Sequence, residues 1–104
     1  LPAEKEVYDI IDTMPSAGFD WVQNDKERSE RFRTMLENGT RADVVSLIST
    51  LHNRRTELAG RGKKLRSSDE AIMQRAERLL YGEFAWVLGI DPSEVVEFIR
   101  KRVE

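Results

Sequence analysis

The sequence predicts an all-α domain, a compact bundle of about five helices, on three observations. Apolar residues recur at spacings of three and four along most of the chain, which is the period of an α-helix. Helix start or stop signals stand at Asn24, Thr40, Gly89 and Asp91. No stretch alternates apolar and polar residues as a half-buried strand does. With 104 residues, 39% of them apolar, the chain suffices for one core and is too short for two, so we expect one helical domain over 1–104.

The first helix is expected from about Ala3 to Met14, where Pro15 and Gly18 end it. Its inward positions follow the helical spacing and are Val7, Ile10, Ile11 and Met14.

The second helix is expected to begin at a capping pair, Asn24 and Glu27, and to end at Asn38 and Gly39. Its inward residues are Phe32, Met35 and Leu36.

Thr40 can cap a third helix, which we expect to end between His52 and Ala59. Its inner stripe is Val44, Val45, Ile48 and Leu51, with Leu47 beside it.

The fourth helix is predicted to be capped by Ser67 and Glu70 and to end at Gly89. Trp86 lies near its end and is expected to cover the core edge against a neighbouring helix. The apolar positions assigned to this helix are Ile72, Met73, Ala76, Leu79, Leu80, Phe84, Val87 and Leu88.

The run Asp91-Pro92-Ser93-Glu94 combines an N-cap, a first-turn proline and an acid, and predicts the start of a fifth helix. Its expected inner face is Val95, Val96, Ile99 and Val103.

The net charge is only −2, but the charges are unevenly distributed. From His52 to Arg66 six basic side chains stand against one acid, a local charge of +5, so the rest of the chain carries −7. Such a segment is typical either of a surface that meets a polyanion or of a solvated loop. The charges alone leave both interpretations open.

Few residues could support catalysis or metal binding. The chain has no cysteine, which excludes disulfides and thiolate metal sites, and its one histidine, His52, has no cysteine partner and lies beside arginines. The glycines at 60 and 62 lack the spacing of a phosphate-binding loop. We therefore expect no catalytic residue, no metal and no cofactor.

The sequence also leads to expectations about the cellular compartment and the extent of the protein. No run of 18 or more apolar residues and no export signal is present, which favours a cytoplasmic protein without membrane association. Because Leu1 is not methionine, we expect the chain to be part of a longer protein.

Trp21 stands in a segment, Ser16–Asn24, that has no helical periodicity. A large aromatic there can seal one end of the core, dock a partner, or contact DNA. The residues of this segment leave the three roles open.

The order of signals from Gly18 onward resembles the carboxy-terminal helical domain of the CarD family of bacterial transcription regulators. The resemblance covers roughly Gly18 to Val103. The resemblance begins with a tryptophan, a charged helix and a glycine turn, in that order. It continues in four later stretches, which are Asp43-Val44-Val45-Ser46-Leu47-Ile48, Leu51-His52-Asn53-Arg54-Arg55, Ala76-Glu77-Arg78-Leu79-Leu80 and Gly82-Glu83-Phe84-Ala85-Trp86-Val87-Leu88.

The resemblance implies a leading helix and linker over 1–18 and a CarD-like domain over 19–104. It implies that an amino-terminal domain, absent from this chain, binds the β subunit of RNA polymerase while the helical domain contacts promoter DNA and modulates open-complex stability. The tryptophan, here Trp21, would act as a minor-groove wedge, with basic residues on phosphates. The DNA-binding residues expected on this basis are Trp21, Lys26, Arg28, Arg61, Lys63, Lys64 and Arg66.

The chain departs from the family pattern where Val22-Gln23-Asn24-Asp25 follows the tryptophan in place of basic residues. Few phosphate contacts on a net negative chain imply weak, largely sequence-independent DNA binding. The alternative hypothesis is a helical protein-protein interaction module in which Phe19 and Trp21 are anchors and DNA has no direct role. The sequence leaves the oligomeric state open.

Overall fold

Five α-helices joined by short connections form the part of the chain that the computed structural model describes, residues 2–103. They are α1 (Glu4–Thr13), α2 (Asp25–Asn38), α3 (Arg41–Ala59), α4 (Ser67–Leu88) and α5 (Val95–Val103). Two short 3-10 turns, η1 (Met14–Ser16) and η2 (Pro92–Glu94), follow α1 and precede α5. Over these residues the fold is all-α, as the periodicity predicts.

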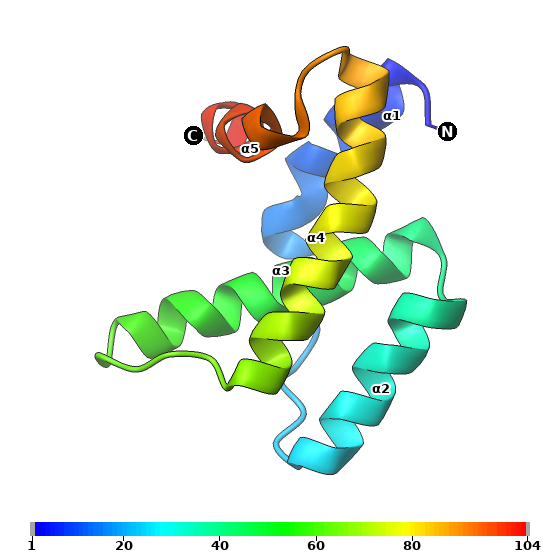
Figure 1. The fold of residues 1–104 in the computed structure, drawn as a ribbon. Coiled ribbons are helices and arrows are strands. Elements are labelled where there is room, and N and C mark those ends of the chain that lie inside the picture. Colours follow the sequence, from blue (N-terminus) through cyan, green and yellow to red (C-terminus); the bar gives the residue numbers. More distant parts are fainter. Residues whose placement is uncertain (1, 104) are drawn as a thin grey trace.

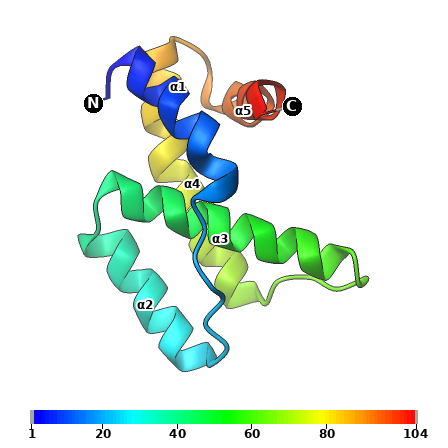
Figure 2. The same ribbon diagram turned by 180° about the vertical axis from the view of Figure 1, so that it is seen from behind.

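The longest helix, α4, is the axis of the molecule. It crosses α3 near the middle of both helices, and the two views show this crossing from opposite sides (Figures 1 and 2). One half of α4 lies near α2 and the end of α3, whereas the other half lies near α1 and α5. The two ends of the molecule are therefore built from different helices on one shared axis.

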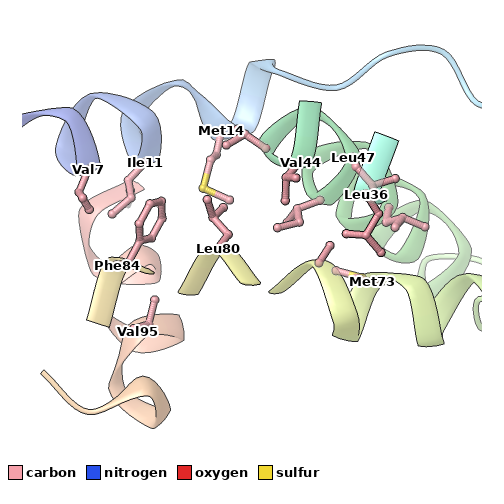
Figure 3. Packing of buried hydrophobic residues seen from close by; sticks show 14 of the residues in the cluster. Val7, Ile11, Met14, Leu36, Val44, Leu47, Met73, Leu80, Phe84 and Val95 are labelled. Atoms are coloured by element: carbon pink, nitrogen blue, oxygen red, sulfur yellow. The ribbon is translucent and has the colours of Figure 1, made fainter. Parts of the chain in front are cut away.

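A single apolar cluster runs along α4 and takes residues from every helix. At one end Val7 and Ile11 of α1 meet Phe84 and Val95, and all four are fully buried (Figure 3). At the other end Met73 packs near residues of α2 and α3, among them Leu36 and Leu47. Because α1 contributes to this cluster, the leading helix shares the core with the rest of the chain.

Local capping fixes most helix ends where the sequence predicts them. The Thr40 hydroxyl accepts from the Asp43 N–H at 3.2 Å, and the Asp43 carboxylate accepts from the Thr40 N–H at 3.0 Å, a complete capping box at the start of α3. Asp91 and Glu94 form the same arrangement before α5. Gly89 ends α4 in the left-handed region, at φ 68°, which favours glycine.

One predicted helix start and one predicted helix end are corrected by the structure. Serine 67 is the first residue of α4 and not its cap, because Arg66 holds the N-cap position without a side-chain bond. The first helix extends over Glu4–Thr13, and Met14 begins the 3-10 turn η1, which contains Pro15.

The prediction that Trp86 covers the core edge is wrong, since 76% of its surface is exposed. Leu79, also assigned to the core, is 52% exposed. The inward residues of α4 are Met73, Ala76, Leu80 and Phe84. A helix turns about 100° per residue, so Trp86, two positions after Phe84, points to the opposite side.

The inner face of α5 is also corrected. Val96 and Val103 are 57% and 44% exposed, whereas Val95 is fully buried. Phe98 stacks on Tyr8 of α1 with ring centroids 6.0 Å apart. Because Val95 faces inward, the residues three and four positions later, Phe98 and Ile99, are those that pack against the core.

Candidate nucleic-acid interface

The segment between η1 and α2 crosses the surface of α3 and brings Trp21 to one end of the molecule. The Phe19 N–H donates to the Thr50 hydroxyl of α3 at 2.9 Å. Gly18 lies so close to α3 that an added Cβ would stand 3.2 Å from Asn53 Nδ2 and 3.4 Å from the Thr50 nitrogen. A small residue at position 18 therefore allows this close approach.

Trp21 is partly buried and packs on the core through Phe32 of α2. The two rings meet edge to face, with centroids 5.9 Å apart and planes at 68°. The Arg28 guanidinium lies 4.5 Å from the indole centroid and that of Arg54 lies 5.2 Å from it. The indole is thus held in place by one aromatic edge and two cations.

Arg28 is the centre of a buried network and not an exposed cation. It is 2% exposed and pairs through two nitrogens with Asp69 of α4, itself 1% exposed, at 3.0 and 2.9 Å. It also donates to Asp25 at 2.8 Å and to the Val22 carbonyl at 2.9 Å. These bonds tie the tryptophan segment, the start of α2 and the start of α4 together.

The electrostatics of this network favour the charged arginine. Burial alone would lower the pKa of Arg28, but the hydrogen bonds and charges of Asp69 and Asp25 together outweigh burial and raise the pKa. Because its donors are engaged inside the protein, we leave Arg28 out of the DNA-contacting set, contrary to the expectation from the sequence.

The other predicted cations are exposed around this network. Arg66, at the N-cap of α4, pairs with Asp25 at the start of α2. Lys26 is the next residue of α2, and its side chain makes no hydrogen bond or ion pair within residues 2–103. The structure thus brings Trp21, Lys26 and Arg66 to one end of the molecule.

The connection between α3 and α4 carries the remaining predicted cations. Gly62 adopts φ 70°, and the following N–H of Lys63 returns to the Leu58 carbonyl at 2.8 Å, closing the end of α3. Arg61 lies 3.3 Å from Glu57. Lys63 and Lys64 are exposed and have no ion-pair partner in the described chain, so their charges are free to meet an anion.

Arg54 is a residue that the sequence did not single out for this site. It covers the Trp21 ring, its Nη1 donates to Glu57 at 3.2 Å, and its buried Nε has no hydrogen-bond partner among the described residues. In the sequence, the one feature that pointed to Arg54 is its position in the basic run His52–Arg66. Only the fold shows that it shares an aromatic neighbour with Arg28.

Acidic side chains are interspersed with these cations. Asp20, Asp25 and Glu27 are exposed on the segment and helix that carry Trp21 and Lys26. They lower the local positive potential, so the strongest unpaired basic surface is the connection that carries Lys63 and Lys64.

Comparisons with known proteins identify no relative: no family model, curated protein or solved structure matches this chain. Within residues 2–103, no group of three or more potential ligand residues is placed to hold a metal ion. None of the described helices combines the length and apolar character needed to cross a bilayer.

Proposed function

We propose that this chain is the promoter-DNA-contacting domain of a CarD-like transcription regulator, and that it influences the stability of the open complex. The observation that carries the proposal is that Trp21, Lys26 of α2 and Arg66 at the start of α4 come from three separate segments and meet at one end of the molecule. In the sequence these residues span positions 21 to 66, and the Arg28–Asp69 and Arg66–Asp25 pairs hold their segments together.

The geometry suits contact with distorted DNA better than readout of base sequence. A tryptophan held by Phe32 and two arginines keeps a fixed orientation, so little conformational entropy is lost when it meets an unstacked base step. The flexible side chains of Lys63 and Lys64 can neutralise phosphates without selecting bases. Binding should therefore prefer forked DNA and depend on salt.

The proposal includes a larger assembly, RNA polymerase, that brings this chain to the DNA. The exposed cations of the site are Lys26, Arg61, Lys63, Lys64 and Arg66, two of which already pair with acids of the chain. So few phosphate contacts give weak binding by themselves, and a tether to RNA polymerase would raise the effective concentration of DNA.

The competing interpretation is a protein-interaction module anchored by Phe19 and Trp21. The Phe19 ring packs on Phe32 at 6.1 Å between centroids, and the Arg31 guanidinium covers it at 4.6 Å. Trp21 is engaged within the protein in the same way, so the ring contacts do not separate the two interpretations. The exposed and unpaired cations Lys26, Lys63 and Lys64 favour DNA.

The test is binding of a fluorescent forked duplex to the isolated chain. Since stacking on one aromatic contributes about 1 to 3 kcal/mol, Trp21→Ala should weaken binding by about fivefold or more. Trp86→Ala is the matched control, because it removes the same side chain from a distant exposed position and should bind as the parent does.

A second variant tests DNA binding without changing a residue that packs on the core, as Trp21→Ala does. Lys63 and Lys64 do not pack in the core, so Lys63→Gln with Lys64→Gln should keep the fold while reducing the slope of log affinity against log salt by about 1 to 2. Unchanged affinity in both variants, with helical content preserved, would remove the proposal.

A further inference from the structure

An exposed row of residues runs along α4, from its ninth residue to the glycine that caps its carboxy-terminal end. Its members recur at alternating spacings of four and three and are Arg75, Leu79, Gly82, Trp86 and Gly89. This is the spacing of the seam between two paired helices, about 3.5 residues. In Figure 1 α4 passes in front of α3, and in Figure 2 it passes behind it, so one side of α4 stands open.

Gly82, at the centre of this row, has no role inside the molecule. An added Cβ would meet nothing within 4 Å, and its φ is not in the left-handed region. Glycine in a helix interior is unfavourable compared with alanine, so its presence calls for a reason. A glycine in an exposed seam lets a second helix approach the backbone closely, between the large side chains of Leu79 and Trp86.

We propose that this seam binds a second copy of the chain, with the two α4 helices antiparallel about a two-fold axis beside Gly82. Leu79 precedes Gly82 by three residues and Trp86 follows it by four. Antiparallel pairing about this point sets Leu79 of each copy against Trp86 of the other. The same surface of each copy therefore contacts that of the other, as a two-fold interface requires.

The charges along the seam complement each other in the same arrangement. Arg75 and Arg78 are exposed and form no ion pair within residues 2–103. Antiparallel pairing places Arg75 of one copy beside the carboxy-terminal end of α4 in the other copy. The last turn of that helix has no basic residue, and exposed Asp91 and Glu94 follow it. A cation there meets both the negative end of the helix dipole and two carboxylates.

The expected dimer is weak and leaves the basic end free. One helix pair buries less than the roughly 800 Å² per partner of a standard stable interface, so association should require a concentration on the order of 0.1 mM. Ser67 lies fifteen residues before Gly82, so the two α4 amino termini would stand roughly 45 Å apart, at opposite ends of the pair.

The first test is sedimentation equilibrium of the chain from about 10 µM to 1 mM. The parent should dimerise, Trp86→Ala should weaken association by about tenfold, and Gly82→Lys should leave only monomer. Thr34→Lys adds the same charge on exposed α2 and should dimerise as the parent does. A parent that stays monomeric, or a dimer that Gly82→Lys does not affect, would overturn the proposal.

A second test addresses the antiparallel arrangement. The chain has no cysteine, so single introduced thiols report cleanly. Under mild oxidation, a mixture of Leu79→Cys and Trp86→Cys should cross-link between unlike chains faster than either variant alone. Faster cross-linking of like chains would contradict antiparallel pairing. Gly82→Ala, which should keep the fold and raise the melting temperature, confirms that position 82 is dispensable inside the monomer.

Discussion

Glu77 is a half-buried carboxylate on α4 whose neighbours include Arg55, Glu70 and the ring of Tyr81. Burial is the largest cause that raises its pKa, the nearby Glu70 raises it further, and Arg55 lowers it in part. The folded state therefore holds the Glu77 proton more tightly than the unfolded state does.

This raised pKa predicts how stability changes with pH. Between the ordinary glutamate pKa, about 4.3, and the higher folded value, the folded state binds more protons, so the free energy of unfolding falls as pH rises through this window. Glu77→Gln should therefore be more stable than the parent at pH 7, measured by urea unfolding, and the difference should vanish below pH 4 or so.

The matched control is Glu37→Gln, which removes the same charge from an exposed position of α2. Its pH profile should retain the fall in stability that Glu77 causes. A Glu77→Gln variant that is less stable than the parent at pH 7, or an advantage that persists undiminished at low pH, would contradict the role given to burial.

Single residues were the hardest features to predict from the sequence. The sequence predicts Arg28 as a phosphate contact, whereas the structure pairs it with Asp69 in the interior. A signal was present: each stands four residues before a buried apolar residue, Phe32 and Met73, and so continues an inward stripe. Periodicity alone does not say that two such charges lie on facing helices.

At the scale of elements, the Arg28–Asp69 pair joins α2 to α4 and carries the stability of the basic end. Removing one member of a buried ion pair leaves an uncompensated charge, so Arg28→Met should reduce the free energy of unfolding by about 3 to 5 kcal/mol. With Asp69→Ala added, the loss should be smaller than the sum of the two single losses, since the pair acts as a unit.

Urea unfolding of both single variants and the double variant measures this coupling. Arg33→Met, on exposed α2, is the control and should change stability by no more than about 0.5 kcal/mol. Additive losses, or an Arg28→Met loss below about 1 kcal/mol, would show that the pair is not the structural link.

Helix boundaries were largely predictable because capping is local. The boxes at Thr40 and Asp91 and the left-handed Gly89 depend on residues within one turn of each other. The exposure of Leu79 and Trp86 does not follow from the sequence, because the apolar residues of α4 occupy more than one face of the helix. Which face of a helix is covered depends on distant segments, here α3 and α1, that local patterns do not place.

At the scale of the whole molecule, α4 links two surfaces of different chemistry. Its amino-terminal end adjoins Trp21 and the exposed cations, whereas its second half carries the apolar seam around Gly82. The convergence of the basic residues could not be deduced from their sequence positions, since it depends on the α2–α4 pairing. The two surfaces can therefore be tested separately.

The most direct test of the proposed function is the map of amide and indole chemical shifts on addition of forked DNA. We expect the largest changes at the Trp21 indole N–H, at Lys26 and across residues 61–66, and little change along the face of Leu79 and Trp86. Changes confined to that α4 face, or to α1 and α5, would contradict DNA contact by the basic end.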